Sequence, residues 1–484
     1  MLFNSFTFLI FFPVVATIYF VLPHRYRWAW LLAASCYFYM AFIPVYILIL
    51  FFTIAVDYVA GILIENAAGS KRKWFLVMSI VANVGVLAVF KYVNFLNANA
   101  HAIAEVFHWP YHLVPLGIIL PIGLSFHTFQ AMSYTVEVYR GRHPAERHLG
   151  IFALYVMFFP QLVAGPIERP QNLLHQFYEK HAFEYERVTD GLRKMAWGLF
   201  MKVVIADRLA RYVNIVYDDP TSFQGLTLVI ATVFFAFQIY CDFAGYSQMA
   251  IGAAEVMGFR LMKNFDRPYL SRSISEFWSR WHISLSSWFR DFVYIPLGGN
   301  RVARPRWYWN IFITFLLSGL WHGANWTFVI WGALNGFYLM FSLFTQGARE
   351  AVARATGLAA HPRLRMVMSV GITFVLCCIA WVFFRANTTT DAIHILSAAL
   401  ARPTAHQILP DILRAEGISR LEVLYSLVLI AGLMTVEVVS TRVDVVKQFR
   451  LQPAWVRWPA YYALCMAVWL LGINTEQAFI YFQF

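Results

Sequence analysis

The chain has 484 residues, of which 60% are hydrophobic and only 13% are charged. A soluble protein usually carries about 25% charged residues, so this composition excludes an ordinary soluble enzyme. The formal net charge is +12, but the basic residues are dispersed in short polar stretches between apolar runs, which argues against nucleic-acid binding. We therefore expect an integral membrane protein that crosses the lipid bilayer many times.

The first part of the chain, residues 1–140, is typical of membrane-spanning helices joined by short loops. Apolar runs at 2–22, 45–64 and 74–90 are about long enough to cross a ~30 Å hydrocarbon core. The first run is not expected to be a cleaved signal, because no basic residue precedes His24 and no small-residue cleavage pattern follows. Asp57 and His127 lie inside apolar stretches. We expect Asp57 to be paired structurally and His127 to have a structural role.

The middle of the chain, residues 150–345, does not divide cleanly into spans of 20 residues. Three prolines and a glycine interrupt 158–170, and polar residues alternate with tryptophans over 271–290. Irregular polar backbone at membrane depth is tolerated only where protein buries it or it lines a watery cavity. We therefore expect short tilted or re-entrant helices around a central chamber. No internal repeat supports a symmetric transporter.

Residues 365–484 predict three further spanning helices, beginning after Arg365, Arg420 and Trp458. The whole chain, 1–484, is thus predicted to be a single all-α polytopic membrane domain of about ten to twelve helices. Lys and Arg gather in alternate loops, including 23–27, 65–73, 139–149, 345–365 and 441–457, and this bias marks the cytoplasmic side. Both termini are then predicted to lie outside, together with the loop 387–421. The five cysteines fall in apolar segments and are expected to be buried thiols rather than disulfides.

Two histidines stand out, because an ionisable side chain in an apolar segment indicates function. His322 lies in SGLWHGANW (318–326), next to small residues that permit close approach. A desolvated imidazole stays neutral and can accept a proton, as a general base must. The alternative, a histidine that merely bridges helices, is about equally plausible from this segment alone. His282 lies in FWSRWHISLS (277–286), where an interfacial helix explains the tryptophans, including Trp281, but not the histidine.

Other polar groups are weaker candidates. Asp242 lies in an apolar helix, and we expect Tyr240, Tyr246 or an arginine from 260–272 to pair with it structurally. The stretch 264–290, including Arg280, is a candidate for contacting an anionic donor, although a solvated cytoplasmic face explains its arginines equally well. No metal is expected, since neither histidine has a second ligand at i+3 or i+4. A serine–histidine pair is not excluded, but no Gly-x-Ser-x-Gly motif occurs.

Taken together, these segments resemble the membrane-bound O-acyltransferase (MBOAT) family, in its bacterial polysaccharide (alginate-type) O-acetylation branch. The resemblance covers nearly the whole chain. It runs through MLFNSFTFL (1–9), LPIGLSF (120–126), FPQLVAGP (159–166), QIYCDFAG (238–245), EFWSRWHISLS (276–286), YIPLGGN (294–300), GLWHGANW (319–326) and FIYFQF (479–484). His127, Gln248 and Glu137 depart from the pattern; none lies in the histidine motifs, but they leave the acetylated polymer open.

The resemblance implies an enzyme in which His322 is the catalytic histidine and His282 the second motif histidine. It implies acetyl transfer from a cytoplasmic donor, expected to be acetyl-CoA, outward to an extracytoplasmic polysaccharide such as alginate. The expected partners are membrane lipid and a periplasmic SGNH-type acetyltransferase, in a bacterial inner membrane. His282 and Asn325 are expected to orient the donor or stabilise the oxyanion, and Trp321 adjoins the catalytic histidine.

Several alternatives stay open from the residues alone. Peptidoglycan or cellulose could replace alginate as the acetylated polymer. A proton-coupled transporter or flippase would use Asp57, Asp242 and the histidines as a relay. A non-catalytic scaffold of a secretion complex would tolerate replacement of both His322 and His282.

Overall fold

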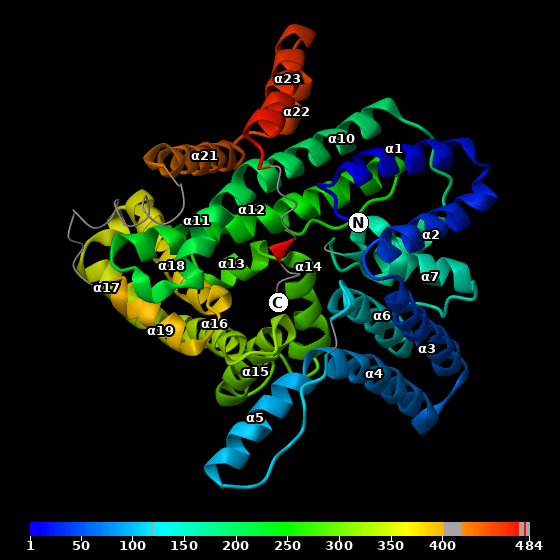
Figure 1. Cartoon of the computed structure of the whole chain (residues 1–484), viewed down its shortest axis with the longest axis horizontal. Helices are drawn as coiled ribbons and strands as arrows, with labels where there is room; N and C mark the ends of the chain where they lie inside the picture. Colours follow the sequence, from blue (N-terminus) through cyan, green and yellow to red (C-terminus); the bar gives the residue numbers. More distant parts are fainter. Residues whose placement is uncertain (118–119, 164, 401–418, 474–478, 481–484) are drawn as a thin grey trace. The chain divides into compact units, whose positions relative to one another are not determined.

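The computed structural model describes residues 1–484 except 118–119, 164, 401–418, 474–478 and 481–484 (Figure 1). The described residues form helices and connecting segments without a β-strand, so the all-α prediction is confirmed. Part of the predicted outer loop 387–421, and the last four residues of the closing motif, lie outside the described residues.

The α-helices follow one another along the chain, with longer connections between Val106 and Leu124 and between Met257 and Ile274. They are α1 (Phe6–Val21), α2 (His24–Met40), α3 (Ile47–Asn66), α4 (Gly69–Lys91), α5 (Val93–Val106), α6 (Leu124–Tyr139), α7 (Leu149–Met157), α8 (Phe159–Leu162), α9 (Pro170–Leu173), α10 (Tyr185–Phe200), α11 (Asp207–Asp218), α12 (Leu226–Met257), α13 (Ile274–Arg280), α14 (Ile283–Phe289), α15 (Arg304–His322), α16 (Trp326–Phe344), α17 (Gln346–Ala355), α18 (Pro362–Arg385), α19 (Thr389–Ala398), α21 (Arg420–Val439), α22 (Val445–Arg450) and α23 (Ala454–Leu471). Two π-helical turns, η3 (Met201–Ala206) and η6 (Arg290–Tyr294), continue α10 and α14.

Six helical segments in the described part of the chain are long and apolar enough to cross a membrane. They are Pro44–Asn66, which includes α3, and α4, α12, α16, α18 and α21. A helix is the form that such a segment takes in lipid, because it satisfies every backbone N–H and C=O internally. The multi-pass membrane architecture is therefore confirmed, while the total of ten to twelve spans and the central chamber stay predictions.

In the middle region, long helices are absent from the two described stretches where the sequence predicts helix breaks. Prolines and a glycine leave only one-turn helices, α8 and α9, between 158 and 173. The tryptophan-rich stretch forms two seven-residue helices, α13 and α14, on either side of His282. Both segments are too short to span a bilayer, as expected of tilted or re-entrant helices. The three spanning helices predicted after 365, 420 and 458 correspond to α18, α21 and α23, which begin at Pro362, Arg420 and Ala454. Of these, α18 and α21 are among the six candidate spans in the described residues.

Two compact units divide the described chain, and each contains separate stretches of the sequence. Among the described residues, unit 1 comprises Met1–Met195 and Tyr246–Lys263, and unit 2 comprises Ala196–Gly245 and the described part of 264–480. In unit 1, α3, α4 and α6 pack together around the buried Asp57. In unit 2, α15 and α16 lie along each other, and α16 also packs on α18 (Figure 1). Both candidate histidines lie in unit 2.

Candidate active site

His322 is the last residue of α15, and its side chain is buried. Its Nδ1 atom lies 2.7 Å from the backbone carbonyl oxygen of Ser318, one helical turn earlier. A carbonyl oxygen can only accept, so Nδ1 must carry the proton and donate it. In the neutral ring the lone pair then resides on Nε2, which is the atom able to take a proton from a substrate.

The turn after His322 is dictated by its small and polar residues. Gly323 has an extended backbone that ends α15. Asn325 then begins α16 as its N-cap, because its side-chain oxygen accepts a hydrogen bond from the backbone N–H of Thr327. The Asn325 amide nitrogen donates to the carbonyl of Asn387. The structure therefore gives Asn325 a clear role in shaping the turn beside His322.

Aromatic rings surround the His322 imidazole. Trp331 and Trp321 lie 4.7 and 4.9 Å from it between ring centroids, and Phe384 lies 5.5 Å away. Trp381 extends this wall by stacking on Trp331. These rings come from α15, α16 and α18, which excludes water from much of the imidazole surface. A proton acceptor in such a place interacts more strongly with a reacting group than it would in water.

His282 lies between α13 and α14 and is completely buried. Its ring packs edge-on against Phe243 of α12, at 4.6 Å, and approaches Trp321 at 6.4 Å. Trp321 thus contacts both histidines, so unit 2 brings the two predicted residues into one aromatic cluster. His282 is outside the candidate spans. Burial lowers its pKa well below 6.5, and the nearby His322 lowers it further, so the ring is neutral.

The tryptophans around His282 do not behave as an interfacial belt. Trp281 is 1% exposed, and Trp278 and Trp288 are also buried. Trp278 donates its Nε1–H to the side-chain oxygen of Asn335. The alternative of an interfacial helix with its tryptophans at headgroup level therefore does not describe this segment.

Asp242 is buried as expected, but its predicted partners are wrong. Its carboxylate lies 2.8 Å from the ammonium of Lys202, which also lies 2.8 Å from Asp207. The other oxygen accepts the backbone N–H of Ile480 at 2.8 Å. Tyr240 instead donates to Glu437 on α21. Sequence reasoning failed here because the cation comes from a different helix, 40 residues upstream.

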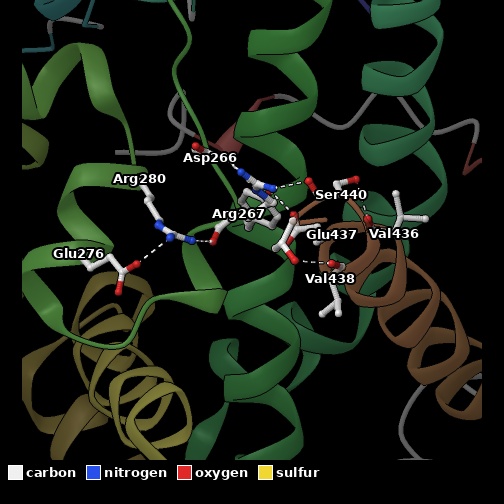
Figure 2. A network of polar contacts seen from close by, with 10 residues as sticks. Asp266, Arg267, Glu276, Arg280, Val436, Glu437, Val438 and Ser440 are labelled. Atoms are coloured by element: carbon white, nitrogen blue, oxygen red, sulfur yellow. Dashed lines mark hydrogen bonds and ion pairs between the residues drawn. The ribbon is translucent and has the colours of Figure 1, made fainter. Parts of the chain in front are cut away.

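Three of the four arginines in 264–290, the stretch expected to meet an anionic donor, have side-chain partners within the protein. Arg280 pairs with Glu276 at 2.6 Å. Arg267 pairs with Asp266 at 2.8 Å and donates to the carbonyl of Ser440 at 2.6 Å (Figure 2). Arg290 likewise pairs with Asp291. The acids near His282 in sequence, Asp266, Glu276 and Asp291, are thus each paired with an arginine.

Two residues that position the cluster were not singled out from the sequence: Lys202 and Asn264. Lys202 had a detectable signature, since it is a solitary cation in the apolar stretch 195–206. Asn264 lies in a polar stretch and has no distinguishing pattern. Ser318, a candidate for the serine–histidine pair, contacts His322 through its backbone carbonyl.

Comparison with known proteins identifies the family of the chain. Residues 147–381, which contain both histidines, match the model of the membrane-bound O-acyltransferase family. The probable alginate O-acetylase AlgI of Pseudomonas aeruginosa is 42% identical over 80% of this chain and 72% of its own length. The Azotobacter vinelandii relative of the same name is 41% identical over 80% of this chain and 75% of its own length.

A relative with a different named polymer is also similar. The peptidoglycan O-acetyltransferase of Helicobacter pylori is 35% identical over 76% of this chain and 72% of its own length. The similarity to these relatives extends well beyond the histidine motifs and covers most of each protein. The chain therefore belongs to the membrane-bound O-acyltransferase family and is a multi-pass membrane acyltransferase.

Proposed function

We propose that this acyltransferase moves an acetyl group from cytoplasmic acetyl-CoA outward, for O-acetylation of an alginate-like polysaccharide. The observation that carries the proposal is the buried, aromatic-walled cluster in which His322 donates through Nδ1 and keeps its proton-accepting atom at Nε2. The alginate O-acetylases, which are the more similar relatives, support acetyl as the acyl group and a uronate polymer as the acceptor.

The proposed chemistry needs one proton acceptor. His322 Nε2 takes the proton of an acceptor hydroxyl as its oxygen attacks the thioester carbonyl carbon. A new C–O ester bond forms, the C–S bond breaks, and the coenzyme A thiolate leaves with the proton that the imidazolium returns. General base catalysis of this kind contributes roughly 10²–10⁴-fold to the rate.

The attacking hydroxyl belongs either to the polysaccharide or to a periplasmic SGNH-type partner that passes the acetyl group on. The positive-inside pattern supports entry of acetyl-CoA from the cytoplasmic face of a bacterial inner membrane, with both termini of the chain in the periplasm. Trp321 contacts both histidines and so helps to shape the proposed acyl site.

The decisive variant is His322→Ala in protein that still inserts in the membrane and elutes as a single folded species. Acetyl-CoA consumption by purified protein in liposomes and polymer acetylation in cells should both fall by at least about 100-fold. Full acetylation by this variant would exclude the proposed role of His322. If a variant with both His282 and His322 replaced still consumed acetyl-CoA and acetylated the polymer, the protein would be a scaffold.

The similarity to a peptidoglycan O-acetyltransferase makes peptidoglycan the second candidate polymer. Mass spectrometry of ester-linked acetate in purified exopolysaccharide and in purified peptidoglycan, with and without the gene, distinguishes the two. Acetate lost from peptidoglycan alone would reject the alginate-like acceptor.

A further inference from the structure

The side-chain oxygen of Asn264 lies at the centre of a small hydrogen-bonded cluster beside His282. It is 3.0 Å from His282 Nδ1, 2.9 Å from the Ser284 hydroxyl and 3.3 Å from the Ser284 backbone nitrogen. All three residues are buried, at 1% exposure or less. One oxygen therefore faces three groups from the opposite segment of the chain.

The backbone N–H of Ser284 establishes which atom of the Asn264 amide faces His282. A backbone nitrogen can only donate, so the atom opposite it must be the amide oxygen rather than the amide nitrogen. The same oxygen faces His282 Nδ1, which must therefore donate its proton to it. The neutral His282 ring then carries its lone pair on Nε2, as the His322 ring does.

The backbone around these residues is held firmly. The Ile283 N–H donates to the Asn264 carbonyl, and the Asp266 N–H donates to the Arg280 carbonyl, both at 2.9 Å. Between them His282 adopts a left-handed conformation, with φ 44°. A non-glycine residue keeps such a conformation only where its surroundings fix it, and such residues cluster at functional sites.

We propose that Asn264 is a positioning residue that, together with Ser284, fixes the orientation and the Nδ1–H tautomer of His282. This inference rests on the proposed acetyl transfer, in which His282 is expected to act beside His322. A purely structural asparagine would need only to tie the two backbone segments together, which the two backbone hydrogen bonds already do. The Asn264 side chain instead accepts from His282 Nδ1, and the Ser284 hydroxyl lies 3.4 Å from the same ring nitrogen.

Replacement of Asn264 by aspartate gives the sharpest test, because it keeps the shape and adds a charge. A carboxylate beside Nδ1 favours the imidazolium form and raises the pKa of His282. The charged and titratable groups on the surrounding elements begin with His322 on α15. On α12 there is Asp242, which is paired with Lys202 of η3. The remaining two are the ion pairs of Asp266 with Arg267 and of Glu276 with Arg280. None of these pairs is altered by the substitution.

Two measurements on Asn264→Asp test the proposal. The acidic limb of the pH profile of kcat/KM should move up by roughly one pH unit or more, since Nε2 becomes protonated where the native ring is neutral. Nitrogen NMR of histidine-labelled protein, with the His282 signals assigned by their loss in His282→Gln, should show a proton on Nδ1 alone in the native protein. In the aspartate variant both nitrogens should be protonated in mildly acidic buffer.

Asn310→Asp is the matched control, because Asn310 is also buried in unit 2 but donates to the Gly299 carbonyl, away from the histidines. It should leave the pH profile in place even if it lowers the folded yield. Ser284→Ala, which removes one of the three donors, should lower kcat by about tenfold without moving the acidic limb.

Three outcomes would overturn the proposal. These are a proton on Nε2 of native His282, an unshifted His282 spectrum in Asn264→Asp, or an equal shift of the profile in Asn310→Asp. The NMR result does not depend on acetyl transfer, so a failure of the proposed function leaves it readable.

Discussion

The ammonium of Lys202 lies 2.8 Å from a carboxylate oxygen of Asp242, and both side chains are almost fully buried. Lys202 also bridges to Asp207, and it sits in the π-helical turn η3 that follows α10. Asp242 directly precedes Phe243, whose ring packs on His282. The ion cluster therefore fixes the part of α12 that supports the second histidine.

Replacing Lys202 by methionine should be strongly destabilising. The change keeps the length of the side chain but leaves two carboxylates buried without their cation, which costs about 3–5 kcal/mol of unfolding free energy. Thermal unfolding of the detergent-solubilised protein checks this. Lys194→Met is the matched control, because Lys194 pairs with Glu255 at a more exposed site, where a loss of about 0–1 kcal/mol is expected. Equal effects of the two variants would contradict the expectation.

Gly319→Ala should reduce both stability and activity. A Cβ atom at Gly319 would lie 2.4 Å from the Phe328 carbonyl oxygen and 3.0 Å from the Gly332 Cα, so α15 and α16 would have to separate. Overpacking of this kind costs about 1–3 kcal/mol, and a displacement of about 1 Å at His322 can lower kcat roughly 100-fold. The readouts are thermal unfolding and acetyl-CoA turnover.

Gly371→Ala on α18 is the control for the preceding variant, since a Cβ atom added there would meet none of the described residues within 4 Å. Alanine at this position should be neutral or stabilise the helix by up to about 1 kcal/mol. Normal turnover by Gly319→Ala would show that the close approach of α15 and α16 does not determine the position of His322.

The sequence predicts the candidate site residues better than it predicts their partners. His282, His322 and Asp242 are visible because a polar group in an apolar run is energetically costly and therefore informative. Their partners are set by packing between segments distant in sequence, as the contact of Ile480 with Asp242 illustrates. Composition and periodicity carry no information on such contacts.

The same distinction applies to the fold. Helices at 6–21, 47–66, 69–91 and 362–385 follow from long apolar runs, and the breaks near 160–170 follow from proline. The left-handed backbone of His282 could not be predicted, because a non-glycine residue adopts this conformation at few positions and only where its surroundings fix it. The neighbouring Ile283 N–H donates to the carbonyl of Asn264, a residue without any local signature.

Glu168→Gln should remove a pH dependence of stability. Glu168 is buried, where it accepts hydrogen bonds from the Met262 backbone N–H at 2.6 Å and from the Asn172 amide. Burial raises its pKa from 4.5 to about 7. The folded protein therefore holds this proton to a higher pH than the unfolded chain. Its unfolding free energy falls as pH rises from about 4.5 to about 7, by about 3 kcal/mol in total.

Glutamine resembles the protonated acid, so the variant should match the native protein at pH 5 and exceed its stability at pH 8. Thermal unfolding at several pH values checks this, with Glu186→Gln on the exposed surface of α10 as the control. The expectation would be contradicted if the difference in stability between the native protein and Glu168→Gln were the same at pH 5 and at pH 8.

Asp57→Asn should preserve acetyl transfer, which separates the acyltransferase from a proton-coupled transporter. Asp57 is buried in α3, where Ser79, Asn83 and Thr135 donate to its carboxylate, the last two at 2.8 Å. All three donors are neutral and can reorient to suit an amide, so we expect a structural contact among α3, α4 and α6. Asp57→Ala should instead cost about 1–3 kcal/mol for each donor left unpaired. Acetyl-CoA turnover in liposomes, normalised to folded protein, distinguishes these cases, and loss of turnover in well-folded Asp57→Asn would favour a proton relay.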